Sequence, residues 1–378
     1  MKIKTLTFTN CQTGWNIKDV HFNNTLTLLV GASGVGKTQI LHVLDTLSRI
    51  ARGYSFNGIE WNITFEHDMK EYCWMGAFQM IPINDDEIEF TDESLIDEKN
   101  RKNYPILKER LSINGDVIIE RDSEDIIFEG QKTVKLDNSK SAVYLIKGEH
   151  VRDIFFWFFQ IYFLETDEIK RYIYPSNLIN IDDFDVIKQS VFVPFYSPME
   201  KLFLSHKAKL KEFYTIFYKF HEIFPLVEDF DFDFKRSTIK KDALSPVLKI
   251  KEKGVDSWIF QKDISSGMLR ALMQITALVF AQDGDVILID EFENGLGVNC
   301  INQLADLVTD PEADVQIIMT SHHPYIINAI PVKWWKIITR NGSEVKTHSA
   351  EEFNIGEHSK HEAFMQLMQN QAYRTGQV

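Results

Sequence analysis

The chain has 378 residues, of which 44% are hydrophobic and 25% are charged, and this composition is typical of a folded globular protein. The net charge of −14 argues against a generally basic surface that coats nucleic acid. A local basic groove remains open for the run FKRSTIKK at 234–241, although a solvated loop or strand edge is the simpler interpretation of that run.

The cysteines and the apolar segments bear on compartment and membrane association. Cys11, Cys73 and Cys300 are odd in number and lack metal-ligand spacing, so we expect reduced thiols in the cytoplasm. The N-terminal residues alternate like a strand and contain no apolar core of a signal peptide. The most apolar run, 154–164, is too short to span a bilayer, and we expect a buried helix or a contact surface for another subunit there. No membrane partner is therefore expected.

Two strands are predicted at the start of the chain, at 2–10 and 25–31, with a turn-rich stretch between them. The second strand leads directly into the motif GASGVGKT and then into a helix over 38–50. The apolar residues of that helix recur at helical spacing and are Ile40, Leu41, Leu44 and Leu47.

A β pattern extends from 52 to 137. Strands at 59–66 and 71–78 flank a polar turn, and the pair Asn114-Gly115 is a β-hairpin signal. This section is predicted to be an arm inserted after the first helix.

Helical sections are predicted over 139–163 and 198–220, and an alternating strand follows at 228–234. An α/β pattern returns later in the chain. One face of the second helical section carries Phe203, Leu210, Phe213, Phe217 and Phe220.

The returning α/β pattern completes the domain that the arm interrupts. A helix is expected over 265–281, a strand over 286–290, a helix over 299–307 and a strand over 315–321. The predicted domains are a discontinuous core at 1–52 and 245–378, a β-rich arm at 53–137 and a helical lobe at 138–244.

The motif GASGVGKT matches the pattern G-x-x-x-x-G-K-[ST] in full, and it lies between a predicted strand and a predicted helix as that pattern requires. Its glycines allow backbone N–H groups to turn toward phosphate oxygens, and the helix N-terminus adds partial positive charge. We expect Lys37 to contact the β- and γ-phosphates of ATP and Thr38 to ligate Mg²⁺. The alternative is a glycine-rich loop with an accidental lysine. The predicted phosphate-binding residues are Gly31, Ser33, Gly34, Val35, Gly36, Lys37 and Thr38.

The segment DVILIDE at 285–291 is a continuous apolar strand that ends in two acids. Buried parallel strands have this pattern, and function in such sheets lies at the carboxyl ends of the strands. We expect Asp290 to bind Mg²⁺ through water and Glu291 to polarise the attacking water as a general base. The alternative is an acidic strand end that only caps the following helix, and the presence of the P-loop motif disfavours it.

Together the two motifs resemble those of the ABC class of P-loop ATPases. In that class a Leu-Ser-Gly-Gly-Gln-like signature precedes the acidic strand. The run ISSG at 264–267 resembles this signature, with Ser266 at the first glycine and Met268 at the glutamine. The resemblance implies that Ser265, Ser266 and Gly267 contact the γ-phosphate of ATP held by a second subunit, since a helix N-terminus is an anion site. The alternative is that these serines only cap their own helix.

The run IIMTSHHP at 317–324 resembles the T-x-H-x-P pattern of the same class, at the end of another apolar strand. The match places Thr320 and Pro324 in register and implies that His322 touches the γ-phosphate. Adjacent side chains on an extended segment point in opposite directions, so His322 and His323 are not expected to clamp a metal ion together.

One further motif departs from the family pattern, and another is not clearly located. After Glu291 the sequence reads FENGLG, and Gly297 stands where the family usually has an aspartate, so the cross-subunit role of that aspartate is not carried over. Gln79 and Gln160 are both weak candidates for the glutamine of the family's Q-loop.

Within the ABC class, the chain resembles the compact RecF- and OLD-like group, which is related to SMC proteins. The spacing from Lys37 to Ser265 exceeds that of transporter subunits, and the sequence lacks the long heptad coils of SMC proteins. The segment after His322 is too short for the Toprim domain of OLD nucleases. The run DEFENGLGVNC at 290–300 resembles stand-alone ATPase subunits of anti-phage defence systems, of PARIS type first and of Septu type second.

This resemblance implies an α/β fold with an ABC-type ATPase head: a P-loop core sheet, an N-terminal antiparallel β subdomain, an inserted β-arm and a helical lobe. It implies ATP and Mg²⁺ as cofactors and a homo-oligomer, either a dimer of heads or a higher assembly. It also implies a separate effector, a Toprim-type or other nuclease or a toxin, and a phage-encoded trigger. The alternative function is that of a RecF-like DNA-repair ATPase that clamps DNA, and the acidic net charge favours the first function.

Overall fold

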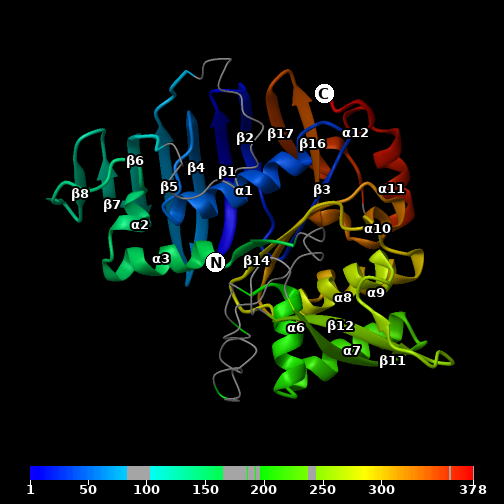
Figure 1. The fold of residues 1–378 in the computed structure, drawn as a ribbon. Coiled ribbons are helices and arrows are strands. Elements are labelled where there is room, and N and C mark those ends of the chain that lie inside the picture. The colour runs from blue at the N-terminus through cyan, green and yellow to red at the C-terminus, as the bar shows by residue number, and fades with distance from the viewer. Residues whose placement is uncertain are drawn as a thin grey trace. The chain divides into compact units, whose positions relative to one another are not determined.

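The computed structural model shows two compact units, Met1–Ile161 with Val332–Val378 and Tyr162–Pro331 (Figure 1). Residues 237–241 of the basic run lie outside the described part of the chain. The described residues are 1–82, 103–164, 185, 192, 196–236, 244–356 and 359–377.

A large sheet forms the body of the first unit. In spatial order its described strands are β3 (Leu26–Val30), β16 (Trp335–Asn341), β17 (Glu344–Ser349), β2 (Trp15–His21), β1 (Lys2–Asn10), β4 (Ile59–His67), β5 (Lys70–Phe78), β6 (Ile106–Ile113), β7 (Asp116–Arg121), β8 (Ile126–Phe128) and β9 (Gln131–Lys132). Strand β16 is parallel to β3 and β17 is parallel to β2, whereas the strands from β2 to β9 pair antiparallel. Strand β3 is buried along its whole length, while β4 alternates between buried and more exposed residues because one face of the sheet meets solvent.

Strand β2 lies in a stretch that the sequence predicted to be turn-rich; residues 11–14 do form turns, but the strand that follows them was not predicted. The buried residues of β2, Ile17 and Val20, are three positions apart instead of two. A bulge explains the spacing, because the pairing with β1 shifts register between Leu6 and Phe8 and Asp19 adopts a left-handed φ of 47°. The extra residue of the bulge removed the alternation by which a strand is recognised.

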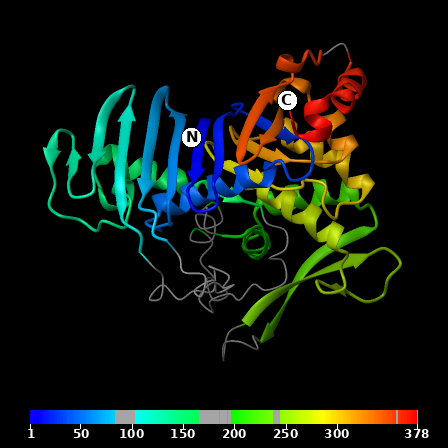
Figure 2. The same cartoon turned by 90° about the horizontal axis from the view of Figure 1, so that it is seen from above.

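Helices cover one face of the sheet in the first unit (Figure 2). They are α1 (Lys37–Ala51), α2 (Ala142–Leu145) and α3 (Glu149–Phe159). Phe158 of α3 packs edge-on against Phe65 of β4 and Trp74 of β5, with ring centroids 5.6 and 5.0 Å apart. The C-terminal part of this unit adds helices that the sequence did not predict, α11 (Lys360–Gln369) and α12 (Gln371–Thr375).

The helical section predicted over 139–163 is divided in the structure. The chain is extended at Ile146 and again at Gly148, and a short strand, β10 (Ile161–Phe163), follows α3. Glycine is a weak helix former, so the break at Gly148 follows from local propensity. The apolar run 154–164 is therefore partly helix and partly strand, and not the single buried helix that was expected.

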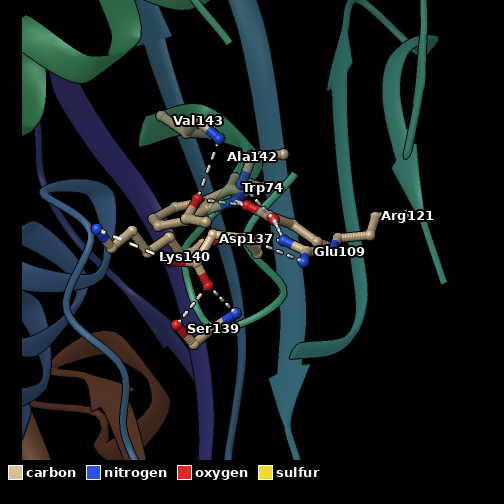
Figure 3. Close-up of polar contacts among 9 residues, drawn as sticks. Trp74, Glu109, Arg121, Asp137, Ser139, Lys140, Ala142 and Val143 are labelled. Atoms are coloured by element: carbon tan, nitrogen blue, oxygen red, sulfur yellow. Dashed lines mark hydrogen bonds and ion pairs between the residues drawn. The ribbon is translucent and has the colours of Figure 1, made fainter. Parts of the chain in front are cut away.

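A buried carboxylate attaches α2 to the strands β5, β6 and β7 (Figure 3). Glu109 of β6 accepts hydrogen bonds from Trp74 Nε1 at 2.9 Å, from Ser141 Oγ at 2.5 Å and from Ala142 N at 2.7 Å. The guanidinium of Arg121 lies 3.9 Å away and donates to two backbone carbonyls of the segment that precedes α2. Because every oxygen of this buried acid has a partner, the network joins the helix to the sheet.

The strands of the second unit form two groups. Their bounds are β11 (Val227–Arg236), β12 (Leu244–Glu252), β13 (Ile259–Phe260), β14 (Val286–Ile289) and β15 (Gln316–Thr320). Strand β14 lies between β10 and β15 and is parallel to β15, and every residue of β14 and β15 is buried. Strands β11, β12 and β13 form an antiparallel group. The buried parallel pair is the arrangement that the sequence predicted for the acidic strand.

The helices of the second unit are α6 (Pro198–Lys207), α7 (Lys211–Ile223), α8 (Ser266–Val279), α9 (Val298–Thr309) and α10 (Pro324–Ala329). The section predicted as helical over 198–220 is two helices, because Lys209 has a left-handed φ of 52° and Leu210 is extended. On the predicted face Phe203, Leu210, Phe213 and Phe220 are buried, and Phe217 is partly exposed. Among the described helices, none is long and apolar enough to cross a membrane.

Candidate functional site

The P-loop connects β3 to α1 in the first unit. Gly36 has a left-handed φ of 104° and directly precedes the first residue of α1. A Cβ atom at Gly31 would lie 2.8 Å from the carbonyl oxygen of Ile338, and one at Gly36 would lie 3.0 Å from the ring of Trp15. Both positions therefore require glycine, and the backbone itself forms the surface of the turn.

The lysine of the motif lies over its own loop. Lys37 is 5% exposed, and its Nζ donates to the carbonyl oxygens of Gly31 and Ala32 at 2.8 and 2.7 Å. Helix α1 has no acidic residue in its first turn, so no carboxylate there offsets the partial positive charge of its N-terminus. The ammonium group of Lys37 and the N-terminus of α1 both favour the binding of an anion at this loop. Of the other predicted residues, Val35 is buried, Thr38 is half-buried, and Ser33 and Gly34 are exposed.

Two side chains beside the P-loop were not predicted from the sequence. Arg340 of β16 donates from Nη1 to the carbonyl oxygen of Gly34 at 3.1 Å, and its guanidinium lies 4.4 Å from the ring centroid of Trp15. The backbone N–H of Arg340 donates to the Gly376 carbonyl at 2.7 Å, which links this contact to the segment after α12. No local pattern identifies this support, because Arg340 and Gly34 are 306 positions apart.

In the second unit, the ends of β14 and β15 are joined through a threonine. The hydroxyl of Thr320 donates to Asp290 Oδ1 at 2.6 Å and accepts from the backbone N–H of Glu291 at 2.7 Å. The N–H of Phe292 donates to the Thr320 carbonyl at 3.0 Å. Glu291 has a left-handed φ of 43°, a conformation that non-glycine residues seldom adopt. The two predicted acids are thus held in a fixed turn.

The two histidines after β15 have different surroundings. His323 is the N-cap of α10, since its Nδ1 accepts from Tyr325 N at 3.3 Å, and its ring stacks on that of Tyr325. His322 is exposed, and its backbone N–H donates to Glu293 Oε1 at 2.7 Å. His323 therefore has a local structural task, while the side chain of His322 faces solvent.

The start of α8 contacts the turn that carries Glu291. Ser265 is the N-cap, and its hydroxyl accepts from Met268 N at 3.2 Å, while Ser265 and Ser266 are both exposed. A Cβ atom at Gly267 would lie 2.7 Å from the Gly295 carbonyl oxygen, so α8 and the turn are in close contact. The second unit therefore brings the serine-glycine run to the acidic turn, and the role of this run toward a second subunit stays a prediction.

Two hydrogen bonds continue this contact toward the predicted base. Arg270 of α8 donates from Nη1 to the carbonyl oxygen of Asn294, and Asn294 Nδ2 donates to Glu291 Oε2 at 3.2 Å. Gln274, which is 2% exposed, donates from Nε2 to the Phe292 carbonyl at 3.2 Å. Arg270 and Gln274 were not predicted from the sequence, although a polar residue among the apolar positions of α8 is a signal for Gln274.

The donor atoms at the end of β14 suit a hard cation. The Asp290 carboxylate supplies oxygen, the ligand that Mg²⁺ prefers, while the Thr320 hydroxyl is already bonded to Asp290 and to the Glu291 N–H. No group of three or more His, Cys, Asp or Glu residues that could hold a metal ion occurs among the described residues. Because Mg²⁺ is commonly held by one or two carboxylates together with substrate phosphates, these residues fit it as a companion of a nucleotide.

The glycine turn, the buried lysine and the acidic end of a buried parallel strand define a P-loop protein with an α/β fold. The family described as "AAA domain, putative AbiEii toxin, Type IV TA system" matches residues 26–328, and the chain belongs to this family. None of the curated proteins compared with the chain matches it.

Solved structures similar to the chain include SMC head domains. The SmcHead bound to the C-winged helix domain of ScpA is 12% identical over 92% of this chain and 97% of its own, with a TM-score of 0.49. The Smc head domain with an extended coiled coil bound to the C-terminal domain of ScpA derived from Pyrococcus furiosus is 13% identical over 93% and 97%, with a TM-score of 0.47. The SMC head domain from Thermotoga maritima is 10% identical over 92% and 99%, with a TM-score of 0.41.

Proposed function

We propose that the chain is a Mg²⁺-dependent ATPase in which Glu291 is the general base. The observation that carries this proposal is the left-handed backbone of Glu291, held by Thr320 directly after Asp290. Such a conformation costs about 1–3 kcal/mol, and strain of this kind concentrates at functional sites. Membership of an AAA-domain family supports a nucleoside triphosphate as the substrate.

Each motif residue has a separate task in this mechanism. Lys37 and the N–H groups of the P-loop bind the phosphates of ATP. Thr38 and Asp290 would hold Mg²⁺, which would supply positive charge to offset the negative charge on the phosphate oxygens. Glu291 accepts a proton from the attacking water, and His322 contacts the γ-phosphate. The hydrolysis products are ADP and phosphate.

The start of α8 serves ATP that is bound to a second copy of the chain. The exposure of Ser265 and Ser266 supports this role, because a helix N-terminus with exposed hydroxyls is an anion site. The active form is then a homo-oligomer, a dimer of heads or a higher assembly, that ATP joins.

In the cell this ATPase acts as a sensor and scaffold that controls a separate effector, a nuclease or toxin, in cytoplasmic anti-phage defence. The family description names a putative toxin and a Type IV TA system, which supports the control of a toxic activity. The resemblance of 290–300 to PARIS-type and Septu-type ATPases supports defence as the setting, with a phage component as the trigger. The second candidate is a RecF-like clamp on DNA, and the net charge of −14 disfavours it.

Two substitutions test the ATPase. Lys37→Ala removes the charge that binds phosphate, so a fluorescent ATP analogue should lose its affinity in equilibrium titrations. Glu291→Gln should retain that affinity and lower the hydrolysis rate by roughly a hundredfold or more, the scale of a lost general base. Unchanged affinity of the first variant would contradict the P-loop assignment, and near-wild-type turnover of the second would place the base elsewhere.

DNA binding separates the two cellular roles. A clamp that neutralises phosphates loses affinity steeply as salt rises, because bound counterions are released. Titration of duplex DNA at several salt concentrations should show no specific salt-dependent binding if the defence role is correct. If the logarithm of the DNA affinity of the ATP-bound chain falls steeply with the logarithm of the salt concentration, the RecF-like role is favoured.

A further inference from the structure

A carboxylate to which the sequence motifs assign no task joins the two loops that carry the proposed catalytic groups. Glu293 lies two positions after Glu291, in the turn that follows β14. Its Oε1 accepts the backbone N–H of His322, in the loop after β15, at 2.7 Å. This is a short bond to an ionisable acceptor, the type that is stronger than a bond between neutral groups.

The turn that carries Glu293 is fixed by hydrogen bonds of its backbone. The carbonyl of the preceding residue, Phe292, accepts from the buried Gln274, and the Phe292 N–H donates to the Thr320 carbonyl. The carbonyl of Glu293 accepts from Leu296 N at 2.9 Å. Glu293 thus stands on a fixed turn, and the position of its carboxylate determines where the His322 amide lies.

The second carboxylate oxygen gives an independent observation. Glu293 Oε2 is buried and has no hydrogen-bond partner among the described residues. Leaving a buried oxygen without a partner lowers the stability of the fold, and each such atom in a native protein calls for a reason beyond packing.

We infer that Glu293 is a positioning residue that holds the backbone amide of His322 and so fixes where its imidazole stands. The inference rests on the proposed function for the chemical task of His322, and the contact itself rests on the geometry. Without the carboxylate, the loop between β15 and α10 loses its anchor at His322. A displacement of about 1 Å in a positioned group can lower a rate by roughly a hundredfold.

Hydrogen exchange tests the contact without any nucleotide. In Glu293→Ala, the peptide spanning residues 320–325 should exchange at least about tenfold faster at the His322 amide than in the wild type, because a charge-assisted bond is lost. Glu293→Gln should remain near the wild type, since its amide oxygen still accepts. Glu222→Ala, which removes an exposed carboxylate from α7, is the matched control. Unchanged exchange in Glu293→Ala would overturn the inference.

Steady-state ATP hydrolysis tests the positioning. Glu293→Ala should lower kcat by roughly tenfold or more with little change in KM, and Glu293→Gln should restore most of the rate. If Glu293 acts through His322, the double variant Glu293→Ala/His322→Ala should be no slower than His322→Ala alone. Additive losses would contradict the inference. A wild-type chain without ATPase activity would contradict the proposed function, and the exchange measurement would then decide the contact by itself.

Discussion

Asp285, at the start of the acidic strand, is a buried acid that takes no part in the proposed chemistry. It is 4% exposed, and burial raises its pKa to about 6. The N–H of Gln282, which donates to Oδ2 at 2.9 Å, and the positive charge of Lys201 act in the opposite direction and lower the pKa. Burial outweighs both, so the folded chain retains a proton on this carboxyl that an exposed aspartate would release.

Asp285 is expected to make the fold less stable as the pH rises from about 4 to about 6. The pKa in the folded state lies above the reference value of 3.8, so in this window the unfolded chain releases a proton that the folded chain keeps. A shift of about two units corresponds to about 3 kcal/mol of unfolding free energy, present below the window and lost above it. Asp285→Asn should remove this decline, which urea unfolding at several pH values measures. An equal decline in the variant would assign the effect to other groups.

At the scale of the residue, the sequence predicted where the motif residues lie in the fold, because their signal is local. The P-loop, Asp290, Glu291 and His322 lie in short motifs, so their place at strand ends followed from the pattern. Their supports could not be predicted, because each is brought to its motif by tertiary contacts. Arg340 reaches the P-loop from a strand near the other end of the chain, and Glu293 acquires its task only when β14 and β15 pair.

At the scale of the element, helix α8 and the turn after β14 are joined by a close backbone approach and a hydrogen bond. The close approach of Gly267 to the Gly295 carbonyl and the bond from Arg270 to the Asn294 carbonyl leave little room for the helix to move independently. Since Asn294 also bonds to Glu291, a displacement at the start of α8 is transmitted to the proposed base. This contact makes the glycine of the serine-glycine run a structural requirement.

Gly267→Ala is therefore expected to disturb both the fold and the turn. The added methyl group would lie 2.7 Å from a backbone oxygen, so the helix or the turn must shift, at a cost of about 1–3 kcal/mol. Ser266→Ala is the neighbouring control, because its side chain is exposed and should change stability by less than about 0.5 kcal/mol. Chemical denaturation measures the free energy of unfolding of both variants. An unchanged value for Gly267→Ala would show that the helix and the turn can move apart at little cost.

The elements predicted correctly are those with an uninterrupted period. The five-residue β3, the acidic β14 and the helix after the P-loop all appear where the pattern placed them. The section predicted as a helix over 139–163 breaks where Gly148 is extended, and two other departures from the prediction involve a residue with a left-handed φ. Asp19 adds a bulge to β2, and Lys209 separates α6 from α7. A single residue with a left-handed φ hardly changes the amino-acid composition of a segment. Hydrophobic periodicity, which is averaged over many residues, therefore does not reveal it.

At the scale of the molecule, the α/β class follows from the motifs, but the order of the strands does not. Strands β2 and β3 are consecutive in the chain, yet the hairpin of β16 and β17 lies between them. This arrangement depends on pairing between residues more than 300 positions apart, for example Glu344 with Asn16. The period of a segment indicates that it is a strand and carries no information about its neighbour.

A substitution at Ser265 tests whether two copies of the chain share an ATP site. If Ser265 serves ATP held by a second copy, Ser265→Arg places a bulky cation at the junction between copies while the P-loop of its own chain is unchanged. ATP affinity of the isolated chain should then remain within about threefold, whereas hydrolysis and ATP-dependent association should be lost. Titration with a fluorescent ATP analogue and sedimentation with Glu291→Gln as background measure the two properties.

Ser257→Arg is the matched control, because Ser257 is also exposed and lies in a turn of the same unit. It adds the same side chain and the same charge, so the effect of a new arginine on solubility appears in both variants, whereas the loss of the α8 N-cap belongs to Ser265→Arg alone. Association that persists in Ser265→Arg would show that the start of α8 lies outside the junction. Loss of ATP affinity in the isolated Ser265→Arg chain would instead assign this stretch to its own nucleotide site or to its fold, and the shared-site proposal would be wrong.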